Sequence, residues 1–167
     1  MITTTTKKQT ATKELEPPQP LKIACTLSVN MESVYHAISG AWIGYAFEDT
    51  PKRVAPTEPF IRYEWDKNND ADYLYPGGAL IFKLNEDSEG VHGYKVIDKA
   101  VREATLKGED SPSFTLDLEA IKRGLRKMAK EEPEEFVSNF LGDRFNMDGP
   151  GGFDFLQDCL FGENIFG

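Results

Sequence analysis

The chain has 167 residues, of which 40% are hydrophobic, 28% charged and 11% aromatic, and its formal net charge is −9. This length fits a single domain, and the composition is typical of a soluble globular chain. The sequence excludes several classes: it lacks the ~18 consecutive apolar residues of a membrane span, the apolar segment of a signal peptide, and the cysteines needed for a disulfide framework.

The negative charge is concentrated near the C-terminal end of the sequence. Residues 131–167 hold nine acidic residues and one arginine, whereas residues 1–22 carry a net positive charge. An acidic field repels the phosphate backbone, so the sequence disfavours direct nucleic-acid binding. Such a field can attract a basic protein surface, and the alternative is a solvated acidic face that keeps the protein soluble.

The N-terminal segment differs in composition from the rest of the chain. Residues 1–20 contain a threonine run and three prolines but almost no apolar side chains, which predicts a disordered arm. We therefore expect residues 21–167 to form one domain. The alternating apolar side chains of residues 21–29 predict its first strand.

A helix is predicted to follow this strand. Asn30 is a favourable N-cap, and helical spacing of apolar residues continues to Glu48. Gly40 and Gly44 are expected to lie on this helix, where they would allow close packing against a strand. The predicted apolar stripe consists of Met31, Val34, Tyr35, Ile38, Trp42 and Tyr45.

The middle of the chain predicts two strands and a further helix. Residues 60–66 alternate in polarity, and residues 78–84 form a short apolar run. Residues 94–107 fit more than one structure, and the spacing of their apolar side chains favours a helix that begins as extended chain at Tyr94.

The clearest helix follows two possible caps, Thr115 and Asp117. Its buried stripe is predicted to contain Leu118, Ile121, Leu125 and Met128. Pro133 suits the first turn of the next helix, which Gly142 would end.

The end of the sequence predicts a connector and a last helix. Residues 149–152, with the sequence GPGG, indicate a turn, residues 153–161 a helix, and Ile165 with Phe166 a short closing strand. The complete order predicts an α+β fold: a small antiparallel sheet with three to five helices packed mainly on one side.

Basic residues near aromatic ones suggest a site for a small anionic ligand. An aromatic ring can stack on a nucleotide base while lysine or arginine contacts its phosphate. Ordinary sheet packing and pairing with neighbouring acids are the alternatives. The residues that we assign to such a site are Arg62, Tyr63, Trp65, Lys83, Lys95, Arg102, Arg123 and Arg126.

The sequence offers little for catalysis. It contains no P-loop, no GxSxG elbow and no HExxH motif, and we expect no cofactor. Asp148, Asp154 and Asp158 are weak candidates for a magnesium or calcium site, with a polar outer face as the alternative. Cys25 and Cys159 lie in apolar segments that are typical of a core.

Several residues of the C-terminal part together resemble a known group of proteins. Those residues are Gly124, Leu125 and Met128, then 133–140, Asp143, Asp148, 155–157, 161–163 and 166–167, with Ala37, Gly40 and Trp42 upstream. Over roughly two thirds of the chain they are similar to a family of small uncharacterised bacteriophage and plasmid proteins. The 66–76 loop, the N-terminal arm and the GPGG segment depart from the pattern. The resemblance implies a cytoplasmic protein of a mobile element and implies no catalytic residue.

These observations favour a non-catalytic accessory protein that antagonises or modulates a host defence or another host process. Two mechanisms stay open: binding a host protein with a basic surface, or sequestering a small anionic, nucleotide-like ligand between the subunits of a homo-oligomer. The alternatives are a metal-dependent hydrolase and a structural component of a virion.

Overall fold

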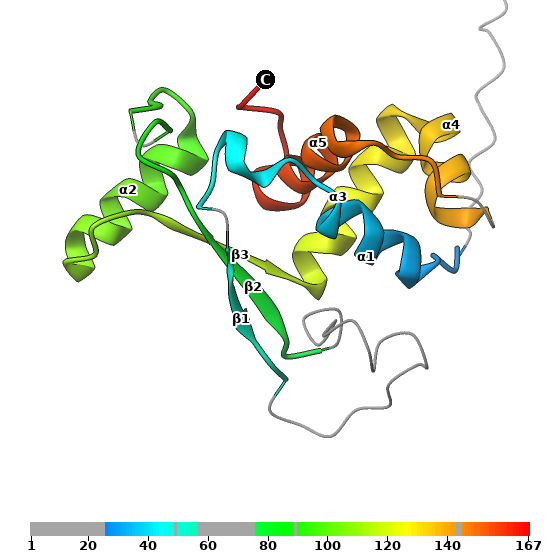
Figure 1. The fold of residues 1–167 in the computed structure, drawn as a ribbon, viewed down its shortest axis with the longest axis horizontal. Coiled ribbons are helices and arrows are strands. Elements are labelled where there is room, and N and C mark those ends of the chain that lie inside the picture. The colour runs from blue at the N-terminus through cyan, green and yellow to red at the C-terminus, as the bar shows by residue number, and fades with distance from the viewer. Residues whose placement is uncertain (1–25, 49, 57–75, 89, 143–144) are drawn as a thin grey trace, which may run out of the picture.

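The computed structural model describes residues 26–48, 50–56, 76–88, 90–142 and 145–167. Within them, five α-helices and a three-stranded antiparallel sheet form the predicted α+β fold. Figure 1 shows α1, α3, α4 and α5 gathered together, whereas α2 lies apart from them. The elements are α1 (Met31–Ser39), η1 (Ile43–Tyr45), β1 (Lys52–Val54), β2 (Ala79–Lys83), α2 (Lys95–Lys107), β3 (Ser113–Asp117), α3 (Leu118–Glu131), α4 (Pro133–Phe136), η4 (Val137–Leu141, a π-helical turn) and α5 (Gly149–Leu160).

The sheet has the order β1-β2-β3, and β2 confirms the strand predicted at 78–84. Leu80 pairs with Leu116 and Phe82 pairs with Phe114 across β2 and β3. These four side chains are buried, whereas Thr115 between them is exposed. Because alternate residues of a strand point to opposite faces, these four side chains lie on one face of the sheet and contribute to the core.

Strand β3 is absent from the sequence prediction, which assigned Thr115 to a helix cap. Thr115 instead lies in β3 and pairs with Ile81 of β2. The segment alternates buried and exposed side chains, as a strand with one buried face does. The predicted cap at Asp117 is confirmed: its carboxylate accepts a hydrogen bond of 2.8 Å from the Ala120 N–H. The predicted stripe of α3 is buried at Ile121, Leu125 and Met128.

Helix α1 is shorter than the sequence predicts. Asn30 caps it as expected, accepting a hydrogen bond of 3.0 Å from the Glu32 N–H. The helix ends at Ser39, and Gly40 is its C-cap. The chain then turns through η1 so that Phe47 reaches the sheet, where it bridges to Leu84. Pairing with the sheet therefore outweighs helical propensity beyond Gly40, and Gly44 lies on no shared helix with it.

Helix α5 is the central helix of the α-helical layer. It begins at Gly149 rather than at 153, and Asp148 caps it by accepting from the Gly151 N–H at 2.9 Å. The GPGG segment is thus the first turn of a helix and not a loop, since proline fits a position where no intrahelical N–H bond is lost. The residues that α5 buries are Gly152, Phe153, Phe155, Leu156, Gln157, Cys159 and Leu160.

Two glycines allow α5 to approach its neighbours closely. A Cβ on Gly124 of α3 would lie 2.3 Å from Cys159 Sγ and 3.1 Å from Cys159 N. A Cβ on Gly152 of α5 would lie 2.5 Å from the Ala37 carbonyl oxygen of α1. Because real Cβ atoms do not approach other atoms this closely, both helix contacts require glycine.

The predicted starts of two further helices are confirmed, and part of a predicted strand is corrected. Tyr94 is the extended N-cap of α2, and Pro133 begins α4, both as expected. Residues 26–30 form no strand, which corrects part of the prediction for 21–29. The predicted arm at 1–20, the strand at 60–66 and residues 21–25 lie outside the described residues.

Replacement of Gly124 by alanine should destabilise the protein. The new methyl group would collide with Cys159, so α3 and α5 must separate, and we expect the free energy of unfolding to fall by about 1–3 kcal/mol. Urea denaturation measures this change. Gly90→Ala is the control because no atom lies within 4 Å of its Cβ position; equal unfolding midpoints for the two variants would contradict the close packing.

Candidate functional site

A hollow in the described part of the chain lies where α5, the segment after α1 and residues 165–167 meet. Its volume is about 600 Å³. We call it the aromatic pocket, and it is lined by Trp42, Tyr45, Pro150, Phe153, Asp154, Ile165, Phe166 and Gly167. Three separate segments therefore contribute to one concave site, as is usual for small-ligand and side-chain pockets.

Two exposed aromatic rings form one wall of this pocket. Trp42 is 51% exposed and Tyr45 is 66% exposed. Their rings stack with centroids 5.7 Å apart and an interplanar angle of 25°, and Tyr45 also lies 6.1 Å from the ring of Phe153. The sequence predicted both rings in a helical stripe; because α1 ends early, they face solvent instead.

Trp42 is held against the first turn of α5. Its backbone N–H donates to the Gly149 carbonyl oxygen at 3.3 Å. A Cβ on Gly149 would lie 2.0 Å from Trp42 Nε1, so the indole occupies the space that any larger residue would need. The position of the indole therefore depends on the same GPGG segment that the sequence suggested was a loop.

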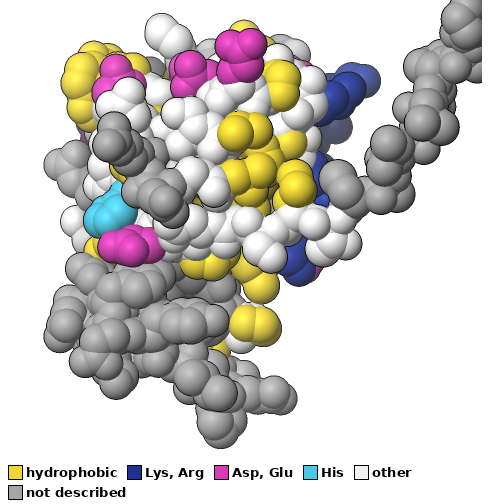
Figure 2. Space-filling view, turned by 90° about the vertical axis from the view of Figure 1, so that its right-hand side faces the viewer, with side chains coloured by type: hydrophobic (Ala, Val, Ile, Leu, Met, Phe, Trp, Pro, Cys, Tyr) yellow, Lys and Arg dark blue, Asp and Glu magenta, His cyan; other side chains and the backbone are white. Residues whose placement is uncertain are grey.

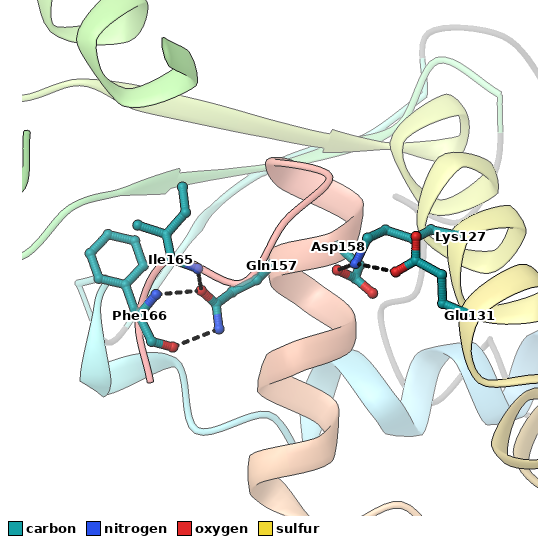
Figure 3. Close-up of polar contacts among 6 residues, drawn as sticks. All are labelled: Lys127, Glu131, Gln157, Asp158, Ile165 and Phe166. Atoms are coloured by element: carbon teal, nitrogen blue, oxygen red, sulfur yellow. Dashed lines mark hydrogen bonds and ion pairs between the residues drawn. The ribbon is translucent and has the colours of Figure 1, made fainter. Parts of the chain in front are cut away.

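The opposite wall is the segment 161–167, which a single buried side chain holds in place. Gln157 is fully buried on α5, and its Oε1 accepts from the Ile165 and Phe166 N–H groups at 2.8 Å each. Its Nε2 donates to the Phe166 carbonyl oxygen, also at 2.8 Å, as Figure 3 shows. The predicted closing strand at 165–166 is therefore wrong: an amide side chain, and not a neighbouring strand, satisfies this backbone.

The segment is also anchored by its rings. Phe47 is 1% exposed, and its ring centroid lies 6.0 Å from that of Phe161 and 6.3 Å from that of Phe166. It also contacts the ring of Phe82 on β2. The pocket wall thus continues directly into the aromatic core.

Asp154 is the charged side chain of the aromatic pocket. Partial loss of solvent around this exposed side chain raises the pKa of its carboxyl above the ordinary value, and the negative charges of Asp158 and Asp148 raise it further, whereas Lys127 opposes the change. Among the described residues that line the pocket, none is lysine or arginine. The pocket therefore combines aromatic surface with one carboxyl group.

A second hollow, of about 340 Å³, lies on the other side of Asp154. Asp154 lines both hollows. We call the second one the acidic hollow, because its lining also includes Glu132, Glu135, Asp148 and Asp158. Its lysine, Lys127, contacts Asp158 at 2.5 Å and Glu131 at 3.2 Å; Figure 3 shows this triad. Burial disfavours the charged form of Lys127, but the two carboxylates raise its pKa overall.

The weak metal candidates have other roles in the structure. Asp148 caps α5, and Asp158 pairs with Lys127. Within the described residues, no group of three or more histidine, cysteine, aspartate or glutamate side chains is placed to hold a metal ion. Cys159 is fully buried, and burial raises the pKa of its thiol well above the ordinary range, as expected for a core cysteine.

The structure does not bring together those predicted anion-binding residues that it describes. Arg62, Tyr63 and Trp65 lie outside the described residues. The described ones lie on three elements and none lines the aromatic pocket: Lys83 ends β2, Lys95 and Arg102 share a shallow hollow on α2, and Arg123 and Arg126 lie on α3. Arg123 donates to the Cys159 carbonyl oxygen at 3.3 Å.

The side chain of Gln157 should control the order of the pocket wall. Gln157→Leu removes three hydrogen bonds at similar volume, so the free energy of unfolding should fall by about 1–3 kcal/mol. Amide hydrogen exchange at Ile165 and Phe166 should become faster. Asn164→Ala, an exposed change in the same segment, is the control, and unchanged exchange in the Gln157 variant would contradict this assignment.

Asp154→Asn should stabilise the protein at neutral pH. When the pKa of a carboxyl is higher in the folded than in the unfolded protein, its ionisation favours the unfolded state. The free energy of unfolding therefore falls as the pH rises from the unfolded pKa to the folded pKa. The melting temperature of the variant should therefore exceed that of the original protein at pH 7, and the difference should shrink as the pH falls toward about 4. A difference that grows on acidification would contradict the inferred repulsion.

Comparison of the chain with protein-family models, with curated proteins and with solved structures finds no match. In the described part of the chain, no helix combines the length and the apolar character that crossing a membrane requires. The resemblance to phage and plasmid proteins therefore stays a prediction, and function is inferred from the geometry of the aromatic pocket and the acidic hollow.

Proposed function

We propose that this chain is a non-catalytic binding protein whose C-terminal region binds a basic surface of a protein partner. The observation that supports it most directly is that the aromatic pocket and the acidic hollow adjoin at Asp154. Aromatic anchors in a concave site surrounded by charge are the typical composition of strong binding spots in protein interfaces.

Acidic side chains at the start of α4 are available to a partner, and one of them, Glu132, lines the acidic hollow. Glu132 and Glu134 are exposed and form no ion pair within the described part of the chain. Figure 2 shows acidic side chains along the upper edge of the face that carries α4, with hydrophobic side chains below them. A surface of this kind accelerates association with a basic protein and sets its orientation.

The biological setting that we propose comes from the resemblance. If the chain belongs to a mobile element, its partner is a host protein in the cytoplasm, and binding would antagonise or modulate a host defence or another host process. The pocket geometry is compatible with this role, because steric blocking of a host protein requires a binding surface and no catalytic group.

The geometry favours a protein partner over a small anionic ligand. Asp154 would repel a phosphate in the aromatic pocket, and the described basic candidates lie on other surfaces. Within the described residues, no metal-binding cluster supports the alternative of a metal-dependent hydrolase.

The proposal predicts salt-sensitive capture of a partner. The immobilised protein should retain a basic host protein from a bacterial lysate at about 50 mM salt and lose it at about 500 mM, because screening weakens exposed charge pairs. Neutralising three exposed acids of the C-terminal region should reduce retention at low salt by about tenfold. The substitutions are Glu132→Gln, Glu134→Gln and Glu163→Gln.

A matched control removes the same number of charges from another part of the molecule. Those control substitutions are Glu86→Gln, Glu109→Gln and Asp110→Asn, all at exposed positions. The control variant should retain the partner normally. Equal loss in both variants would indicate a general charge effect, and a small anionic mass retained in native mass spectrometry would favour the sequestering mechanism instead.

A further inference from the structure

We infer that the aromatic pocket is a recognition site for a guanidinium group, presented by an arginine side chain of the partner. This inference rests on the proposed function and adds to it the side chain that the pocket receives. It follows from the aromatic lining, the carboxyl group of Asp154 and the lack of basic side chains among the lining residues that the structure describes.

The lining selects a cation. The faces of aromatic rings carry negative potential, so a cation within about 6 Å of a ring centroid is attracted to it. Trp42, the most effective ring for this interaction, is half-exposed in the pocket wall. Asp154 adds a carboxylate on the α5 side, and no lining lysine or arginine in the described chain competes for it.

The shape of the cation follows from the arrangement of the rings. Trp42 and Tyr45 are close to parallel, at 25°, and both are largely exposed, so they present flat surface to an incoming group. A guanidinium is planar and weakly hydrated, and it can stack on a ring while its edge donates two hydrogen bonds to one carboxylate. An ammonium group is compact and strongly hydrated, and it makes neither the flat contact nor the paired bonds.

The pocket has room for the side chain and its attachment. A volume of about 600 Å³ falls within the range of sites that bind drug-sized ligands, and an arginine side chain is smaller than such ligands. The acidic hollow, which shares Asp154, lies beside the pocket. A second basic residue of the same partner segment would reach Glu132 or Glu135 there.

The test is a titration of the full chain with three blocked amino acids: N-acetyl-arginine methylamide and its citrulline and lysine counterparts. The indole N–H signal of Trp42, assigned by its loss in Trp42→Phe, reports binding by NMR. The arginine probe should bind with a Kd of about 1 mM. Citrulline has the same shape without the charge and should bind at least tenfold more weakly, as should lysine.

Variants locate the binding within the pocket. Asp154→Asn should weaken the arginine probe by about tenfold, and because Asp154 is exposed this change leaves the fold intact. Trp42→Ala should weaken it similarly, as read from the remaining tyrosine signals. Glu86→Gln removes the same charge from an exposed residue that does not line the pocket, and it should leave the Kd unchanged.

The outcomes separate this inference from the proposed function. Equal binding of citrulline or lysine overturns the guanidinium assignment, and so does an arginine probe that fails to bind at about 20 mM. If salt-sensitive capture of a basic protein persists in either case, the proposed function stands and only the pocket assignment fails. If capture is absent while the arginine probe binds, the pocket assignment stands and the protein-binding role fails.

Discussion

The close approach of α5 to α1 and α3 is the constraint on which the rest of the structure depends. Gly124 and Gly152 remove the side chains that would separate these helices, and Cys159 and the Ala37 carbonyl fill the space. This packing of α5 fixes the positions of two of its side chains, Asp154 and Gln157. Asp154 lies between two hollows, and Gln157 is fully buried beside the last segment of the described chain.

The aromatic pocket results from the way three segments meet around α5. Helix α1 ends at Ser39, and the chain must then reach the sheet at Phe47, which leaves Trp42 and Tyr45 in a short turn with their rings exposed. The segment after α5 returns across the helix and provides the opposite wall. Exposure of large apolar side chains to water is unfavourable. The two exposed rings beside the Asp154 carboxyl group are therefore the feature for which we propose a binding role.

Local features of this fold could be predicted from the sequence. The caps Asn30 and Asp117, the buried stripe of α3 and the start of α4 at Pro133 all depend on interactions within one helical turn. The end of α1, the strand β3 and the start of α5 could not, because each depends on a partner distant in the sequence. Helical spacing at Trp42 continues after the helix has ended, and the GPGG segment has a turn-like composition while packing as helix against Trp42 and Ala37.

The candidate site was less predictable than the fold. The sequence predicts a site in which basic residues lie near aromatic ones, whereas the structure groups aromatic residues around an acid. In the sequence, Asp154 is a weak metal candidate and Phe166 is predicted to belong to a short strand. No local pattern connects Trp42, Asp154 and Phe166, since their proximity depends on the packing of α5.

Gln157 holds the last segment through main-chain groups, so these hydrogen bonds do not depend on the side chains that line the pocket. Its amide binds only main-chain groups of residues 165 and 166, and every residue type except proline offers the same N–H and C=O groups at those positions. Substitution of Ile165 by any residue except proline would therefore keep these hydrogen bonds, whereas glutamate at 157 would lose the donor and leucine would lose all three bonds. Substitution at position 165 could alter what the pocket accepts while the hydrogen bonds to Gln157 and the ring contacts of Phe166 stay the same.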